Sequence, residues 1–216
     1  GLGCDDANGI CVALQMLEVL PDLKVIFTTE EELGAKGATE ACFNTDFLYN
    51  VRYFLQADRR GSSDLITHTN GIDVVTEEFL ADLKPLMKKY GYSENIGTYT
   101  DVGELVENAR ICGVNISCGY YSEHTSNEYC KISELENCLN FVYEILTTLK
   151  SETQYHIEIS RYSSNYSYYW DYEPHPYNKV EEEYPSEFDR SDVSSDLPCD
   201  KCRDMDCMHC KHLNDY

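Results

Sequence analysis

The sequence predicts an α/β fold, a three-layer sandwich in which helices cover both sides of a mostly parallel, mixed sheet. Three observations lead to this prediction. Helical and strand patterns alternate from residue 10 to residue 149, as is typical of a layered α/β domain. The strand patterns are short apolar runs, which suit strands buried on both faces. The 216 residues are enough to bury one sizeable core.

The first two expected elements are a helix at 10–20 and a strand at 23–27. The helix is predicted because apolar residues recur at helical spacing. These residues are Ile10, Ala13, Leu14, Leu17 and Leu20. The strand is predicted from a short apolar run that ends in Phe27, and we expect it to be buried and parallel to its neighbours.

Five further elements are expected between residues 51 and 118. Buried strands are predicted at 51–57, 65–68 and 114–118, and helices at 76–90 and 101–109. Pro85 lies inside the first of these helices and is expected to strain it, because proline removes one backbone hydrogen bond.

The last helix has the clearest pattern. Ser133 and Glu136 have the spacing of a capping box, which predicts the start of the helix at Ser133. One apolar face follows. It comprises Leu135, Cys138, Leu139, Val142, Ile145, Leu146 and Leu149.

A change of composition near residue 150 predicts a domain boundary. Val, Ile and Leu become sparse there, and Tyr, Ser, Asp and Glu replace them, so the following segment has little apolar surface to bury. We therefore divide the chain into a folded domain at 1–150 and an acidic, tyrosine-rich tail at 151–216.

The charge and the cysteines limit the partners and the compartment. A net charge of -22 opposes binding to nucleic acid or anionic lipid, so neither is expected as a partner. No apolar run approaches the roughly 18 residues of a membrane span, and no signal-peptide pattern is present. The cysteines of the domain have irregular spacings and read as reduced thiols, which predicts a cytoplasmic protein.

Polar residues gather in four segments that begin a helix or follow a predicted strand. They are GCDDANG at 3–9, TTEEELG at 28–34, ADRRG at 57–61 and CGYYSEHTSNEY at 118–129. Ligands collect at the carboxyl ends of strands in open α/β sheets. Carboxylates together with one histidine form a ligand set that Zn²⁺ accepts, so these segments indicate a hydrolytic metal site.

Each segment also has a structural interpretation. Asp5 and Asp6 are suitable caps for the following helix. The run 30–32 suits a solvated first helical turn. Asp58 stands beside two arginines and can form an ordinary ion pair, and His124 can serve as a hydrogen-bonded structural residue. The order of the four segments, and their shared position at strand ends, favours the functional interpretation.

In this order, GCDDANG, FTTEEELGAKGA, DRRG and SCGYYSEHTSNEY resemble the co-catalytic zinc exopeptidase superfamily of aminopeptidases, dipeptidases, carboxypeptidase-like enzymes and related amidohydrolases. The resemblance covers residues 1–149 and implies the phosphorylase/hydrolase-like fold. It implies that Asp5 bridges two zinc ions and that Glu31 is the general base. It further implies that Glu32 and His124 bind one metal ion and that Asp58 binds the other.

The sequence departs from the family pattern at its beginning. Family members carry a His-x-Asp motif upstream of the bridging aspartate, and nothing before Asp5 supplies it, so we expect the N-terminal part of the domain to be missing. One metal ion would keep Asp5, Glu32 and His124. The other would keep only Asp5 and Asp58, so we expect one ion to bind better than two.

The spacing of the motifs limits the subfamily. Only 65 residues separate Asp58 from His124, and predicted core elements fill them, so no lid domain is expected. The chain therefore resembles the compact aminopeptidase-like branch. Asp64, Asp101 and Glu128 align with acidic positions near the family's active site and are candidates to bind a free amino terminus, or else they are solvated loop carboxylates.

The tail contains a cysteine cluster that suits a second, structural zinc ion. Cys199, Cys202, Cys207 and Cys210 form two CxxC pairs, with His209 and His212 as substitutes. Residues 199–212 are therefore a possible zinc knuckle. Alternatively, these cysteines are redox-active or simply reduced thiols. The tail is also a candidate surface for an unidentified protein partner.

The sequence therefore predicts a metal-dependent exopeptidase, an aminopeptidase, that hydrolyses a peptide or aminoacyl substrate with a metal-activated water and Glu31 as base. The metal is expected to be zinc, or else cobalt or manganese. Two alternatives stay open. One is an amidohydrolase of N-acyl amino acids, and the other is a non-catalytic, metal-binding interaction protein.

Overall fold

The computed structural model describes residues 2–149 and 154–159. The predictions for the tail, including the zinc ligands Cys199, Cys202, Cys207 and Cys210, lie outside these residues. The seven cysteines of the described part carry free thiols. None of the helices in that part is both long and apolar enough to cross a membrane.

The centre of the domain is a five-stranded mixed sheet. Its strands are β1 (Phe54–Arg59), β2 (Asp64–Thr69), β3 (Ile72–Asp73), β4 (Ser93–Ile96) and β5 (Gly113–Ser117). Four of them follow the order β1-β5-β2-β3, and β4 pairs with β2. β1 is parallel to β5 and β2 is parallel to β4, whereas β2 is antiparallel to β5 and to β3. The sheet is therefore mixed and partly parallel.

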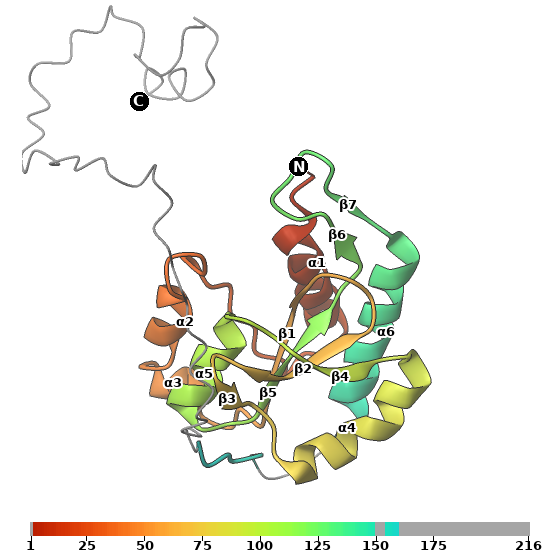
Figure 1. Cartoon of the computed structure of the whole chain (residues 1–216). Helices are drawn as coiled ribbons and strands as arrows, with labels where there is room; N and C mark the ends of the chain where they lie inside the picture. The colour runs from red at the N-terminus through yellow and green to blue at the C-terminus, as the bar shows by residue number, and fades with distance from the viewer. Residues whose placement is uncertain (1, 150–153, 160–216) are drawn as a thin grey trace, which may run out of the picture. The chain divides into compact units, whose positions relative to one another are not determined.

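Six helices and a small hairpin accompany the sheet. The helices are α1 (Cys4–Val19), α2 (Lys36–Ala41), α3 (Thr45–Leu48), α4 (Glu77–Tyr90), α5 (Asp101–Ala109) and α6 (Ile132–Thr148). The short strands β6 (Tyr120–Tyr121) and β7 (Tyr129–Cys130) pair antiparallel. In Figure 1, α1, α4 and α6 gather in one group and α2, α3 and α5 in another. In the first group α6 contacts α1 and α4, and in the second α2 contacts α5.

The core lies between the sheet and these helices. Leu65, Ile66, Val114 and Ile116 of the sheet are almost completely buried. Phe141 of α6 stacks on Tyr92, which follows α4, with ring centroids 4.3 Å apart. Burial of such large side chains supplies most of the favourable free energy of folding, so the helices are fixed against the sheet.

Most predicted elements are confirmed, with small shifts at their ends. The helix predicted at 101–109 is α5, the helix at 76–90 is α4, and three of the predicted strands are β1, β2 and β5. Pro85 lies inside α4 without ending it. Thr76 caps α4 by accepting a hydrogen bond from the Phe79 N–H at 3.2 Å.

The strand predicted at 23–27 is wrong. The segment is irregular and only partly buried, and Phe27 is 55% exposed. Within the described residues, no backbone hydrogen bond joins this segment to a strand. An apolar run is therefore present without the ladder that would make it a strand.

Two details of the predicted helices are also wrong. The last helix begins after Lys131, so Ser133 lies inside α6 and no side chain caps its start. The first helix forms, but its buried residues include Val12 and Met16, whereas Ile10 and Leu14 are exposed. Because this helix is apolar on more than one face, its periodicity did not identify the packed face.

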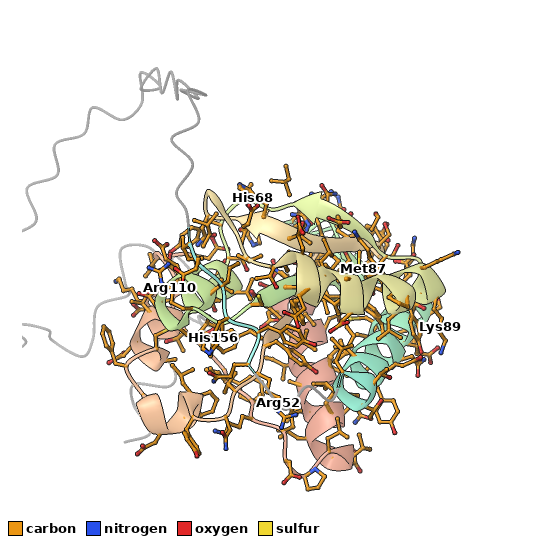
Figure 2. The ribbon with its side chains drawn as sticks, turned by 90° about the horizontal axis from the view of Figure 1, so that it is seen from below. Arg52, His68, Met87, Lys89, Arg110 and His156 are labelled. Atoms are coloured by element: carbon orange, nitrogen blue, oxygen red, sulfur yellow. The ribbon has the colours of Figure 1, made fainter. Side chains whose placement is uncertain are left out.

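Residues 154–159 lie against the domain, beyond the boundary predicted at residue 150. The Tyr155 N–H donates to the Arg52 carbonyl at 3.0 Å, and the Ile157 N–H donates to the Arg110 carbonyl at 3.1 Å. Figure 2 shows His156 between the labelled Arg52 and Arg110. Tyr155 and Ile157 are buried, so this segment adds to the core.

The contact between α4 and α6 predicts a large loss of stability when Phe141 is truncated. We expect Phe141→Ala to lower the free energy of unfolding by about 3–5 kcal/mol, because it removes a fully buried ring and leaves a cavity. Equilibrium denaturation with urea measures this change. Tyr143→Ala, on the exposed side of the same helix, should change it by less than about 0.5 kcal/mol. Equal effects of the two substitutions would contradict the described packing.

Candidate functional site

All five residues predicted to bind metal or act as the base line one cavity of about 630 Å³. They are Asp5, Glu31, Glu32, Asp58 and His124. They come from α1, the loop before α2, β1 and the loop between β6 and β7. The structure therefore brings together residues that are up to 119 positions apart in the chain.

A tight turn carries the two adjacent glutamates. The N–H groups of Gly34 and Ala35 both donate to the Glu31 carbonyl, at 3.1 and 2.9 Å. Gly34 has a φ of +93°, a conformation that glycine adopts easily. Gly37 approaches Thr29 so closely that a Cβ would lie 2.6 Å from its backbone nitrogen and oxygen. Because this is a turn, Glu31 and Glu32 can both face the cavity.

The start of α1 presents Asp5, and Glu128 holds this backbone. The two carboxylate oxygens of Glu128 accept hydrogen bonds from the Gly3 N–H at 2.8 Å and from the Asp5 N–H at 2.9 Å. These bonds lower the pKa of Glu128. The peptide bond between Asp5 and Asp6 is cis. Glu128, a candidate ligand for a substrate amine, therefore has both of its oxygens engaged by the backbone.

Asp58 lies near the end of β1, where the pairing with β5 is irregular. Its carboxylate accepts hydrogen bonds from Gln56 Nε2 at 3.2 Å and from the Tyr120 hydroxyl at 3.4 Å. Its backbone N–H donates to Asn115 Oδ1 at 3.0 Å, and its carbonyl accepts from Asn115 Nδ2 at 3.0 Å. Both the side chain and the backbone of Asp58 are thus held by neutral polar groups.

His124 contacts two of the other predicted ligands. Its Nε2 atom lies 3.0 Å from Asp5 Oδ2 and 3.3 Å from Glu32 Oε1. His124 has a φ of +59°, which is uncommon for a residue other than glycine. The neighbouring Glu123 forms an ion pair of 3.0 Å with Arg60, which joins the His124 loop to the end of β1.

Burial, and secondly neighbouring carboxylates, raise the pKa values of Glu31 and Asp58 in the cavity and of Asp6, which follows Asp5 in the chain. Burial, with a further contribution from Asp5 and Asp101, raises the pKa of Asp6 to about 6. Burial is also the main cause of the raised pKa values of Glu31 and Asp58, and neighbouring carboxylates add to both shifts. The site therefore concentrates negative charge in a partly dehydrated place, where a cation would be stabilised.

The donor atoms are chemically suited to a divalent metal ion. The imidazole of His124 contacts the carboxylates of both Asp5 and Glu32. Donor atoms that share a tetrahedral zinc ion at about 2.1 Å lie about 3.4 Å apart, close to these two separations. In the described part of the chain, however, no group of three or more His, Cys, Asp or Glu side chains is already arranged to hold a metal ion.

Two other predicted residues have structural partners. Asp101 is buried at the start of α5 and accepts a hydrogen bond from the Thr28 hydroxyl, while its Oδ1 atom has no hydrogen-bond partner. Asp64 forms an ion pair of 3.3 Å with Arg59. Neither residue lines the cavity.

Sequence reasoning missed several polar residues of the site. Tyr120, Glu123, Asn115 and Tyr99 line the cavity. Asn115 gave a usable signal, because an asparagine inside an apolar strand needs hydrogen-bond partners when it is buried. The others lie in loops or short strands, where residue type alone does not indicate a direction.

Comparison with known proteins gives structural matches only. No protein-family model matches the sequence, and no curated protein matches it. The dodecameric PhTET1-12s matches at 18% identity with a TM-score of 0.51, covering 67% of this chain and 49% of that one. A TET aminopeptidase from the marine sediment archaeon Thaumarchaeota archaeon SCGC AB-539-E09 matches at 18% identity with a TM-score of 0.53. This match covers 68% of this chain and 48% of that one.

A third match is aminopeptidase APDkam598 from the archaeon Desulfurococcus kamchatkensis. Its identity is 21% and its TM-score 0.50, with 64% of this chain and 46% of that chain covered. The chain thus spans about half the length of these solved structures. At such identities the similarity concerns the fold, which is α/β and similar to that of TET aminopeptidases.

The two bonds from Glu128 predict a change in amide exchange near Asp5. Glu128→Gln replaces one acceptor oxygen by an NH₂ group, so one of the Gly3 and Asp5 amides loses its partner. We expect that amide to exchange faster with solvent, and nuclear magnetic resonance can measure the rate. Glu136→Gln, an exposed change on α6, is the control. Unchanged exchange at both amides would show that Glu128 does not hold this segment.

Proposed function

We propose that this chain is a metal-dependent exopeptidase of the aminopeptidase type. The observation that supports the proposal is the convergence of Asp5, Glu31, Glu32, Asp58 and His124 on one cavity. These are the residues to which the sequence resemblance assigns metal binding and proton transfer. The fold, similar to that of aminopeptidases, is consistent with this assignment.

The proposed metal ligands fall into two groups. His124 contacts both Asp5 and Glu32, and these three residues would hold one divalent ion, with zinc as the first choice. Asp58 lines the same cavity as Asp5, and these two carboxylates would share a second ion. Burial, followed by the charges of Asp6 and Asp5, raises the pKa of Asp58. A bound divalent ion would lower the pKa of a water molecule and polarise the scissile carbonyl.

Glu31 is the proposed general base. It lines the cavity next to Glu32, and its pKa is raised, mainly by burial. A carboxylate with a raised pKa accepts a proton from water more readily at neutral pH, and it can then pass that proton to the leaving amine. Glu31 would therefore perform both proton transfers of peptide-bond hydrolysis.

The electrostatics favour a substrate with a free amino terminus. Carboxylates outnumber the basic groups that line the cavity, and both lining arginines are paired with acidic residues. An α-ammonium group is attracted to such a surface, whereas an N-acylated substrate carries no positive charge there. This supports an aminopeptidase over an amidohydrolase of N-acyl amino acids.

We also infer a domain without a lid, arranged as a three-layer sandwich. The segment between Asp58 and His124 forms the remaining strands of the sheet, α4, α5 and the first strand of the β6–β7 hairpin. This segment belongs entirely to the described part of the chain, and its use in these core elements supports the inference.

Replacement of the proposed base should reduce catalysis with little effect on binding. We expect Glu31→Gln to lower kcat for an aminoacyl p-nitroanilide by about 10²–10⁴-fold, because it removes the proton acceptor. KM should stay nearly constant because the metal ligands are unchanged. Steady-state kinetics of the zinc-loaded chain test this, with Glu30→Gln on the same turn as the control.

Two results would refute the proposed function. One is unchanged kcat in Glu31→Gln. The other is a zinc-loaded wild-type chain that cleaves neither free nor N-acetylated substrates. Faster cleavage of the N-acetylated substrate would instead favour the amidohydrolase.

His124 predicts the behaviour of the metal site itself. We expect His124→Ala to weaken Mn²⁺ binding by more than about 100-fold, because it removes a ligand rather than a partner of a ligand. Electron paramagnetic resonance measures the free ion. Mn²⁺ is preferred as the probe because it favours oxygen and nitrogen donors over the thiolates of the tail.

The matched control for this measurement is His68→Ala. His68 is a partly exposed histidine of β2 that pairs with Asp73 at 2.8 Å. Mn²⁺ affinity should be unchanged in this variant. Equal affinities in the His68 and His124 variants would show that His124 is not a ligand.

A further inference from the structure

The irregular pairing of β1 with β5 occurs at Asp58. Gln56 pairs with Asn115, and the next pair joins Arg59 to Ser117, so three steps along β1 match two along β5. Ala57 and Asp58 therefore lie in a bulge between these neighbouring strands, which are seen together in Figure 1. A bulge leaves a residue without its ladder partner and turns a side chain in a new direction.

The side chain of Asn115 supplies the partners that the ladder lacks. Its Oδ1 atom accepts from the Asp58 N–H, and its Nδ2 atom donates to the Asp58 carbonyl, both at 3.0 Å. Nδ2 also donates to Thr100 Oγ1 at 3.1 Å. Both N–H donors of the amide are thus used, and Asn115 is only 3% exposed.

Thr100 connects Asn115 to a further hydrogen-bond partner. The Thr100 hydroxyl, which accepts from Asn115, donates to Gln56 Oε1 at 2.8 Å. The same Gln56 oxygen accepts from the Val102 N–H at 2.9 Å, at the start of α5. The bulge is therefore connected through satisfied hydrogen bonds to a helix, which limits its freedom to move.

We propose that Asn115 is the positioning residue of the metal site, and that its side-chain amide maintains the β1 bulge which directs the Asp58 carboxylate towards Asp5. This inference rests on the proposed function, because it assigns Asn115 to a ligand of that site. Asn115 acts through the backbone of Asp58 and not on the substrate.

Without this amide, the N–H and the carbonyl of Asp58 would lose their partners. A buried polar group without a partner destabilises the fold, because its lost hydrogen bond to water is not replaced. β1 would recover this loss by closing the regular ladder with β5. A shift of one residue in a strand turns each side chain to the opposite face, so the Asp58 carboxylate would leave the cavity.

The experiment compares Asn115→Ala and Asn115→Leu with the wild-type full chain. Leucine has the same number and branching of side-chain heavy atoms as asparagine but no hydrogen-bonding group, so it serves if the alanine variant does not fold. Asn137→Ala is the matched control, because Asn137 Nδ2 also donates to a backbone carbonyl at 3.0 Å, that of Tyr90, outside the cavity. Amide exchange at Asp58 and Mn²⁺ affinity are measured for each.

We expect the Asp58 amide of the Asn115 variants to exchange about tenfold faster or more. Mn²⁺ binding should weaken by about 10–100-fold, as for other residues that orient a metal ligand. Asn137→Ala should match the wild type in both measurements. A variant that only lost global stability would speed exchange throughout the core rather than at Asp58.

Two results would overturn the inference. One is Asp58 exchange in Asn115→Ala equal to that in Asn137→Ala, since the amide would not hold the bulge. The other is faster exchange with unchanged Mn²⁺ affinity, since the bulge would not direct the ligand. A wild-type chain that binds no Mn²⁺ refutes the proposed function separately, and the exchange rates then decide whether Asn115 holds Asp58.

Discussion

The constraint on which this site depends is the mutual repulsion of carboxylates that the fold brings into one partly dehydrated cavity. Burial and, secondly, neighbouring charges raise the pKa values of Glu31 and Asp58 in the cavity, and also that of Asp6, which follows Asp5 in the chain. Repulsion would separate these groups unless other contacts fixed them. The contacts that do so act on the backbone: Glu128 binds the amides of Gly3 and Asp5, and Asn115 binds both sides of Asp58.

The sequence predicted correctly those helices whose large apolar side chains lie on the face that packs against the core. α5 and α4 were predicted almost to their ends, because their apolar stripes coincide with the packed faces. The prediction of a strand at 23–27 was wrong because a strand requires a neighbouring strand to pair with. The apolar run does not indicate whether such a neighbour exists. The predicted start of α6 at Ser133 was wrong for a related reason. A Ser and a Glu at capping-box spacing can also lie within the first turn of a helix.

The sequence named residues that the structure brings to one cavity, but it did not name the groups that support them. Asp5 and His124 were assigned to one site because of the resemblance to a known family, together with the tendency of ligands to gather at strand ends. The partners of their backbone could not be predicted in this way. Whether Glu128 binds a substrate amine or two backbone amides depends on the position of Gly3, and this position is fixed only by the folded chain.

The arrangement also explains why one end of a mixed sheet is enough for the site. The parallel neighbours β1 and β5 both contribute residues to the cavity. The Asn8 side chain of α1 donates to the Cys118 carbonyl at 2.8 Å, just after β5, so the start of α1 is tied to the same end. β6 begins two residues after Cys118, and the loop with His124 follows it. The cavity therefore depends mainly on the parallel pair β1 and β5 and on a helix fastened to its end, while Ile66 of β2 and the segment after β4 complete its lining.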